Sequence, residues 1–199
     1  DELKIYPCSL IESAELMQVY QRGEWTPYSE EVLLDVLSAC FLSTPEYCRL
    51  TRVVRDIPST DIVAGEMKPN FRQTVEAALR ARGLRSPDIR GREIRGRAVS
   101  PDELHLDEIH YETGVGEEVF LQAITADRRI AAFLRLSLPQ ADPIVPELAG
   151  AAMIREVHVY GQAVAIGAAE DGKAQHSGLG TGLIERAADV VLKEGRKLV

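Results

Sequence analysis

The chain reads Gln175-His176-Ser177-Gly178-Leu179-Gly180-Thr181-Gly182, and this stretch decides how the rest of the sequence is interpreted. Its glycines at every second position allow a tight turn in which backbone N–H groups come close to a ligand. Residues 183–193 follow with apolar side chains at helical spacing. A glycine turn that opens a helix directs unpaired N–H groups and the positive end of the helix dipole at an anion. The stretch therefore predicts a phosphate-binding turn from Gly178 to Gly182, followed by a helix from Leu183.

The run from Met153 to Tyr160 precedes this turn and alternates apolar with polar residues, which is typical of a strand. Side chains two positions apart share one face of a strand, so Glu156 and His158 point to the same side. A His or Glu can act as a general base or position a water molecule. A hydrogen bond from His158 to a neighbouring backbone group is an equally good interpretation. The candidate catalytic residues are Glu156, His158 and Tyr160.

The glycine spacing differs from the two common nucleotide-binding motifs, because it is not G-x-G-x-x-G and no G-K-[ST] follows it. The pattern Gln-x-x-Gly-x-Gly instead resembles the acetyl-CoA pyrophosphate loop of the GNAT acyltransferases. Together with Arg-Glu-Val-His-Val-Tyr-Gly at 155–161, it resembles the acyltransferase domain of the Elongator catalytic subunit family, the tRNA wobble-uridine carboxymethyltransferases. Two more stretches carry this resemblance: Leu3 to Pro7, after which Cys8 replaces the family's threonine, and Arg55-Asp56-Ile57-Pro58.

The resemblance and the order of strand and helix patterns predict an α/β (α+β) fold in three parts. Residues 1–85 are expected to be the C-terminal part of a radical-SAM domain, the end of a partial barrel. Residues 86–101 are expected to be an arginine-rich linker. Residues 102–199 are expected to be a GNAT-like acetyl-CoA domain with a mostly antiparallel sheet. Because the family continues past both ends, the resemblance implies a fragment whose acetyl-CoA domain is incomplete at its C-terminus.

The resemblance also implies an activity and its cofactors. In the family, a radical generated from S-adenosyl-L-methionine at a [4Fe-4S] cluster acts on acetyl-CoA, and a carboxymethyl group is installed at C5 of the wobble uridine of tRNA. The three cysteines here, Cys8, Cys40 and Cys48, do not form the cluster's C-x3-C-x2-C motif, so no metal ligands are predicted. The predicted acetyl-CoA-binding residues are Glu156, Val157, His158, Val159, Gln175, His176, Ser177, Gly178, Leu179, Gly180, Thr181 and Gly182.

Two other functions remain open at this point. The first is an ordinary GNAT N-acetyltransferase that acts on an amine. The second is a tRNA-binding module that holds acetyl-CoA as a structural ligand, because the strand and helix that normally complete the acyl site are missing from the pattern. The expected partners are tRNA and, following the family, other Elongator-type subunits or a second copy of the chain.

The distribution of charge favours a nucleic-acid partner in spite of a net charge of −8. Residues 49–97 hold 12 Lys and Arg against 6 Asp and Glu, a net charge of +6, so the remainder carries −14. Guanidinium groups suit bidentate contacts with phosphate. Pairing of Arg90 or Arg92 with Asp88 or Glu93 is an equally good, purely structural interpretation. The candidate tRNA-binding residues are Arg80, Arg82, Arg85, Arg90, Arg92, Arg95 and Arg97.

Composition and cysteine usage indicate the compartment. The chain is 45% hydrophobic and 27% charged, as in ordinary globular proteins. No apolar run reaches the length of about 18 residues that a membrane helix requires, and the first residues lack the pattern of a signal peptide. The cysteines form no C-x-x-C pair. These features predict a reduced, cytoplasmic setting without membrane insertion.

Overall fold

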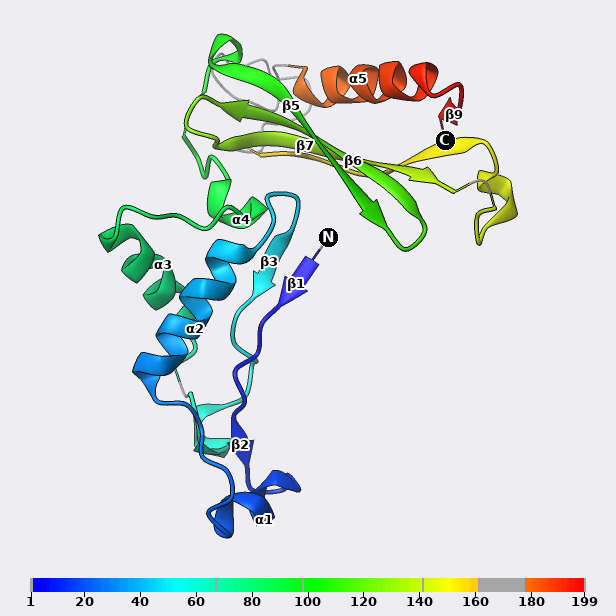
Figure 1. Cartoon of the computed structure of the whole chain (residues 1–199). Helices are drawn as coiled ribbons and strands as arrows, with labels where there is room; N and C mark the ends of the chain where they lie inside the picture. The colour runs from blue at the N-terminus through cyan, green and yellow to red at the C-terminus, as the bar shows by residue number, and fades with distance from the viewer. Residues whose placement is uncertain (1, 67, 98, 141, 161–177, 199) are drawn as a thin grey trace. The chain divides into compact units, whose positions relative to one another are not determined.

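A computed structural model describes residues 2–66, 68–97, 99–140, 142–160 and 178–198 (Figure 1). The chain forms two compact units, Asp1–Arg92 and Glu93–Val199. The boundary falls inside the stretch 86–101 that the sequence predicts as a linker. Both units contain helices and strands, which confirms the expected mixed α/β class. None of the helices within the described ranges is long and apolar enough to cross a membrane.

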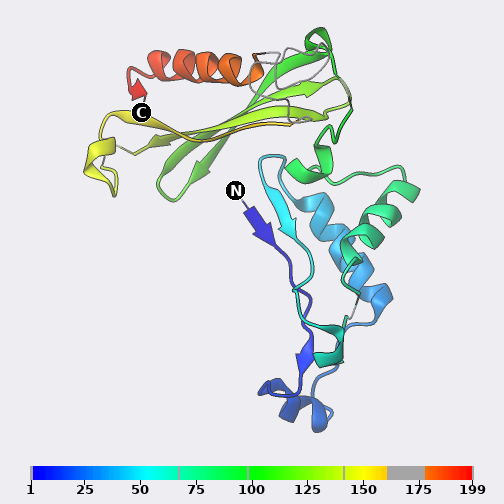
Figure 2. The same cartoon turned by 180° about the vertical axis from the view of Figure 1, so that it is seen from behind.

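The first unit combines short paired strands with helices (Figures 1 and 2). Strand β1 (Glu2–Lys4) pairs in parallel with β3 (Arg49–Arg52), and β2 (Leu10–Ile11) pairs antiparallel with β4 (Ile62–Ala64). The helical segments are α1 (Leu16–Gln21), α2 (Glu30–Ser43), a 3-10 turn at Ser59–Asp61, α3 (Phe71–Ala81) and α4 (Ile89–Arg92).

The core of the first unit lies where the apolar faces of α2 and α3 meet. Each of these faces repeats a large apolar side chain every fourth residue, which forms a stripe along one side of a helix. Helix α2 begins at a side-chain cap, because the hydroxyl of Ser29 accepts a hydrogen bond from the N–H of Val32 at 3.3 Å. The buried residues of this core are Leu33, Leu37, Phe41, Leu50, Val53, Phe71, Val75 and Leu79.

The second unit consists of a five-stranded sheet in the order β5-β6-β7-β8-β9 and helix α5 (Leu179–Lys193). The first four strands are antiparallel neighbours, and β9 joins β8 in parallel. In both views α5 runs along one face of the sheet. The strands are β5 (Leu104–Thr113), β6 (Gly116–Thr125), β7 (Ile130–Pro139), β8 (Ala151–Val159) and β9 (Lys197–Leu198), with 3-10 turns at Pro101–Glu103 and Pro146–Leu148.

The two faces of this sheet differ in chemistry. The face under α5 is apolar: Val119, Leu121 and Leu134 pack there against Leu183 and Val191 of the helix. Because strand side chains alternate, the intervening residues of β6 and β7 point to the opposite face. That face carries Glu118, Phe120, Gln122, Phe133 and Arg135, all of them buried. The apolar face packs against the helix, and the opposite face carries buried polar, charged and aromatic side chains.

Helix α5 begins at Leu179, four residues earlier than the sequence predicts. Of the three glycines, only Gly178 has a left-handed backbone, with φ of +70°. Gly180 and Gly182 are helical, and the N–H of Gly182 donates to the carbonyl of Gly178 at 2.9 Å. The prediction of a turn that continues to Gly182 was therefore wrong, because a single left-handed residue is enough to change the chain direction here.

Candidate functional site

Within the described residues, strand β8 has one edge that is largely without a strand neighbour. Along its other edge, it pairs with β7 from Met153 to Val159. Towards β9, the part of the chain that the structure describes pairs β8 only at Ala151 and Ala152. Backbone N–H and C=O groups must find partners when they are removed from water. The edge from Met153 to Val159 therefore offers hydrogen-bonding groups to an extended ligand.

The first turn of α5 lies beside the end of this open edge. A Cβ added to Gly180 would lie 3.7 Å from Cγ2 of Val159, the last residue of β8. The N–H groups of Leu179, Gly180 and Thr181 have no acceptor within the helix, as in the first turn of any α-helix. The turn contains no acidic side chain. It is thus suited to an anion. The predicted ligand residues Gln175, His176 and Ser177 lie outside the described residues.

His158 and Glu156 form a close pair on β8. The Nε2 atom of His158 is 3.2 Å from Oε2 of Glu156, and about half of the histidine side chain is exposed. The imidazole stacks on the ring of Phe133, with centroids 5.0 Å apart and an interplanar angle of 25°. Tyr160 lies parallel to it at 6.4 Å. The three predicted catalytic side chains therefore lie together, with the imidazole reaching solvent.

The hydrogen-bonding network behind this pair was missed at the sequence level. Arg135 on β7 lies opposite Glu156 and donates from Nε to Oε1 of that carboxylate at 2.6 Å. Its Nη1 atom donates to the hydroxyl of Tyr111 on β5 at 2.9 Å. Tyr111 donates in turn to Glu118 on β6 at 2.5 Å, and Arg155 pairs with the same carboxylate. The signal was available, because a charged residue in the apolar run 130–136 needs a buried partner.

A local irregularity in β8 gathers these charges on one face. Arg135 pairs in register with Glu156, whereas the next residue, Leu136, pairs with Ile154. Arg155 is therefore an extra residue in the strand, a β-bulge, and such bulges redirect side chains. As a result both Arg155 and Glu156 contact groups of the polar face. Strict alternation along β8, as the sequence suggested, would have separated them.

Two ionisable groups in the network have displaced pKa values. Burial alone would raise the pKa of Glu156, but the hydrogen bond and charge of Arg135, with a smaller contribution from His158, outweigh it and lower that pKa below its ordinary value. Burial, followed by the hydrogen bond to Glu118, raises the pKa of Tyr111 to about 12. Glu156 is thus held ionised and Tyr111 is held as a neutral donor.

The seven candidate tRNA-binding arginines fall into two classes. Arg92 is buried and donates to the backbone carbonyls of Pro87 at 2.7 Å and Glu46 at 2.8 Å. Arg90 is half-buried and donates to the carbonyl of Thr51 at 2.7 Å. These two hold backbone segments together. The exposed members are Arg80, Arg82 and Arg85 in the first unit and Arg95 and Arg97 in the second.

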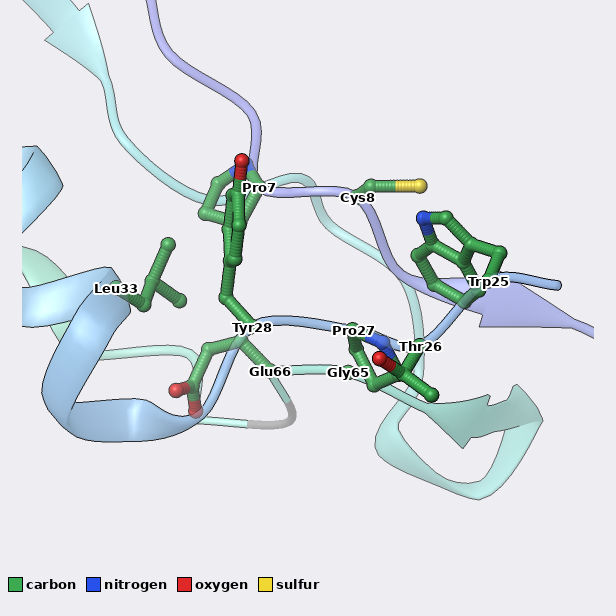
Figure 3. A pocket seen from close by; sticks show the side chains of 9 residues that line it. All are labelled: Pro7, Cys8, Trp25, Thr26, Pro27, Tyr28, Leu33, Gly65 and Glu66. Atoms are coloured by element: carbon green, nitrogen blue, oxygen red, sulfur yellow. The ribbon is translucent and has the colours of Figure 1, made fainter. Parts of the chain in front are cut away.

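A pocket in the first unit was not predicted from the sequence. Figure 3 shows the side chains of Trp25 and Tyr28 on two sides of it, with Cys8 between them. Its volume is about 350 Å³. Gly65 has φ of +114°, and a Cβ there would lie 2.9 Å from the carbonyl oxygen of Cys8, so only glycine lets the two segments approach. The lining residues are Pro7, Cys8, Trp25, Thr26, Pro27, Tyr28, Leu33, Gly65 and Glu66.

The described ranges contain no cluster of His, Cys, Asp and Glu side chains that could hold a metal ion. Three candidate sites stand out among the described residues. They are the open edge of β8 with the first turn of α5, the polar face of the sheet, and the aromatic pocket of the first unit.

Comparison with known proteins shows similarity along the whole chain. The Radical_SAM C-terminal domain family matches residues 1–81. The tRNA uridine(34) acetyltransferase of Dehalococcoides mccartyi is 34% identical over 193 residues, which cover 94% of this chain and 42% of that protein. Elongator complex protein 3 of Drosophila melanogaster is 32% identical over 201 residues, which cover 98% of this chain and 36% of that protein.

A solved structure has a similar fold. The archaeal Methanocaldococcus infernus Elp3 with an N-terminal deletion of residues 1–46 is similar with a TM-score of 0.85 and 34% sequence identity. The match covers 99% of this chain and 48% of that chain. The chain thus spans less than half the length of the relatives that it matches.

Proposed function

The chain belongs to the Elongator catalytic subunit family, and from this membership we propose that it is the acetyl-CoA-binding part of a tRNA-modifying acyltransferase. In the whole protein, the acetyl group would be converted with a SAM-derived radical into a carboxymethyl group at C5 of the wobble uridine. Residues 1–85 would form the C-terminal part of the radical-SAM domain, and residues 102–199 would form a GNAT-type domain. Residues 86–101 would link these two domains. The observation that carries the proposal is the open edge of β8 ending at the first turn of α5.

This edge and this turn fit the two chemically different parts of coenzyme A. Its pantetheine arm is extended and carries amides, so it can pair with the N–H and C=O groups of β8 from Met153 to Val159. Its pyrophosphate is an anion, so it suits the N–H groups at the start of α5. Gly178, Gly180 and Gly182 present no side chain to obstruct the phosphate, and a Cβ at Gly178 or Gly182 would meet nothing within 4 Å.

Individual residues of the chain would then have different roles in the reaction of the acyl donor. When bound, acetyl-CoA supplies a thioester that can be attacked at its carbonyl carbon. His158 would take the proton of the attacking water, and Glu156 would orient the imidazole. The ring of Tyr160 lies near the imidazole and roughly parallel to it. SAM and the [4Fe-4S] cluster would belong to the whole protein, because the cysteines of this chain do not have the cluster motif.

Calorimetry of acetyl-CoA binding tests this proposal. In Gly180→Val, a branched side chain would occupy the approach of the phosphate beside Val159. Losing one or two charge-assisted hydrogen bonds, each worth about 1.5–3 kcal/mol, predicts an affinity at least about tenfold weaker. Helical geometry at Gly180 tolerates valine, so circular dichroism should show an intact fold.

A matched control distinguishes a local effect from a general one. Gly114 lies in the turn between β5 and β6, where a Cβ would meet nothing within 4 Å. Gly114→Val should leave the dissociation constant unchanged. Equal affinity of wild type and a folded Gly180→Val variant would show that the start of α5 is only a structural turn. An amine-acetylating activity without tRNA would instead support an ordinary GNAT N-acetyltransferase.

We assign the tRNA contacts to the exposed arginines. Removing Arg80, Arg82 and Arg85 together should weaken tRNA binding and reduce the slope of log K against log salt by about 0.7–0.9 for each phosphate that is no longer neutralised. The double variant Arg90→Ala/Arg92→Ala should instead lower the free energy of unfolding, because it leaves partly buried carbonyls without these donors. Unchanged tRNA binding by the triple variant would show that the RNA-binding surface lies on other residues.

The other partners in this proposal follow from family membership alone. Further Elongator-type subunits, or a second copy of the chain, would complete the assembly. Light scattering of the chain with and without tRNA is the direct measurement of self-association. A tRNA-binding module with structural acetyl-CoA would bind both ligands without any release of CoA, so CoA release is the readout that separates it from an acyltransferase.

A further inference from the structure

Arg135 is a buried charged residue at the centre of the sheet of the second unit. It is only 1% exposed. Its guanidinium lies over the ring of Phe120, at 5.1 Å from the centroid, and near that of Phe133, at 5.8 Å. Removing a guanidinium from water is costly unless its donors are satisfied. Apolar residues pack well at the neighbouring positions of β7, so the retention of a charge here requires an explanation.

The donors of Arg135 are aimed at two functional groups. Nε donates to Oε1 of Glu156 at 2.6 Å, and Nη1 donates to the hydroxyl of Tyr111 at 2.9 Å. Tyr111 is fixed in turn by Glu118, whose second oxygen pairs with Arg155. Two guanidinium groups thus balance two carboxylates within this set, and strands β5, β6, β7 and β8 each contribute a member. We call this set the Arg135 network: Tyr111, Glu118, Arg135, Arg155 and Glu156.

The Arg135 network ends at His158. An ionised Glu156 can only accept hydrogen bonds, so the nearby Nε2 of His158 must carry a hydrogen. In the neutral imidazole the lone pair then lies on Nδ1. Stacking on Phe133 restricts rotation of the ring. The geometry therefore selects one tautomer and one orientation of the exposed base.

We propose that Arg135 is a positioning residue that acts on His158 through Glu156. It holds the carboxylate ionised and directed at Nε2, so that Nδ1 of His158 faces outward as the proton acceptor. Tyr111 and Glu118 hold Arg135 from the other side. This inference rests on the proposed acyl-transfer function for the meaning of the base, but the tautomer that it requires can be measured without any activity.

Long-range proton–nitrogen NMR of the 199-residue chain labelled at histidine provides the first test. His158→Gln identifies the signals of His158. Wild type should show the Nε2–H tautomer at neutral pH, whereas Arg135→Met should show a mixture, because Glu156 is released. The imidazole contacts Glu156, Phe133 and Tyr160, and the carboxylate of Glu156 accepts from Arg135. Arg135→Lys keeps the charge and should therefore restore part of the wild-type signal.

A matched variant controls for the loss of a partly buried, ion-paired arginine as such. Arg186 on α5 pairs with Glu108 of β5 and is about one third exposed. Arg186→Met should leave the tautomer of His158 unchanged. If Arg135→Met folds and keeps a pure Nε2–H tautomer, Arg135 is structural only and the proposal is overturned. If Arg135→Met does not fold, Tyr111→Phe removes one support of Arg135 and should shift the tautomer in the same direction to a smaller extent.

Steady-state release of CoA from acetyl-CoA by the same variants provides the second test. Because Arg135 does not lie on the open edge of β8, Arg135→Met should lower kcat by about tenfold or more with KM within about twofold, a small part of the general-base effect. A raised KM with unchanged kcat would overturn the positioning role. An altered tautomer with no binding of acetyl-CoA by wild type would instead reject the proposed function and leave the Arg135 network intact.

Discussion

Two buried polar clusters within the described residues are built in different ways. In the first unit, Asp88 is fully buried and accepts hydrogen bonds from the N–H groups of Leu50, Arg90 and Gly91 at 3.0–3.2 Å and from the hydroxyl of Ser86 at 2.6 Å. In the second unit, the hydrogen bonds of the Arg135 network described above join one side chain to another. Asp88 thus binds mainly backbone groups, whereas the Arg135 network leads through Glu156 to the exposed imidazole of His158.

This difference indicates what each cluster does. A carboxylate that binds three backbone N–H groups fixes the path of the chain, here where α4 begins beside β3. A cluster that runs through side chains leaves the backbone to the sheet and instead fixes the orientation and charge of its last member. The first cluster is therefore expected to control stability, and the second to control the chemistry at His158.

The largest expected effect is on the backbone-bonded cluster. Asp88→Ala leaves the N–H groups of Leu50, Arg90 and Gly91 without their carboxylate acceptor, so we expect the free energy of unfolding to fall by about 3–5 kcal/mol. Urea denaturation followed by circular dichroism measures it. The control is Asp56→Ala, which removes an exposed ion pair with Arg52 of 2.8 Å and should cost about 0–1 kcal/mol. Equal unfolding midpoints for the two variants would contradict the assignment.

A smaller effect is expected where a glycine approaches the same cluster. A Cβ at Gly91 would lie 2.5 Å from the carbonyl oxygen of Ser86 and 2.8 Å from Oδ1 of Asp88. Gly91→Ala must therefore displace backbone, and we expect a loss of about 1–3 kcal/mol. At Gly182 in α5 a Cβ would meet nothing within 4 Å, so Gly182→Ala should stabilise by about 0.5–1 kcal/mol. If both variants were stabilising, the close contact of Gly91 with Ser86 and Asp88 would be contradicted.

Sequence reasoning recovered the parts of the molecule that depend on local patterns. Alternation predicted β8, helical spacing predicted α5, and the family resemblance, confirmed by the comparisons, rested on short motifs such as Arg55-Asp56-Ile57-Pro58. The start of α5 was missed because glycine permits both a turn and a helix. The GNAT identity of the second unit and the three-part division remain predictions.

The Arg135 network could not be assembled from the sequence, for a physical reason. Its members lie on strands whose pairing is set by the whole sheet. The bulge at Arg155 brings both Arg155 and Glu156 to the polar face, which strict alternation does not predict. Arginine contacts with RNA were equally hard to assign, because composition does not separate a buried Arg92 from an exposed Arg82. A charge inside an apolar run indicates that a buried partner exists, but not which residue it is.

The smallest expected effect separates the side-chain network from the backbone-bonded cluster by pH. Tyr111 has its pKa raised to about 12 by burial and by Glu118, so the folded chain keeps this phenol protonated where an unfolded chain would lose the proton. Its contribution to stability is therefore fully present below the ordinary tyrosine pKa of 10.0 and is lost as the pH rises towards about 12.

Unfolding by urea at pH 9 and pH 11 should show a larger loss of unfolding free energy between the two pH values for wild type than for Tyr111→Phe. Absorbance of the phenolate should show one late-titrating tyrosine that Tyr111→Phe removes. Tyr6→Phe, at an exposed tyrosine of the first unit, should leave that late titration in place. Identical pH dependence of stability in wild type and Tyr111→Phe would mean that the Tyr111 hydroxyl is not held between Arg135 and Glu118 in solution, and the support of Arg135 from that side would have to be abandoned.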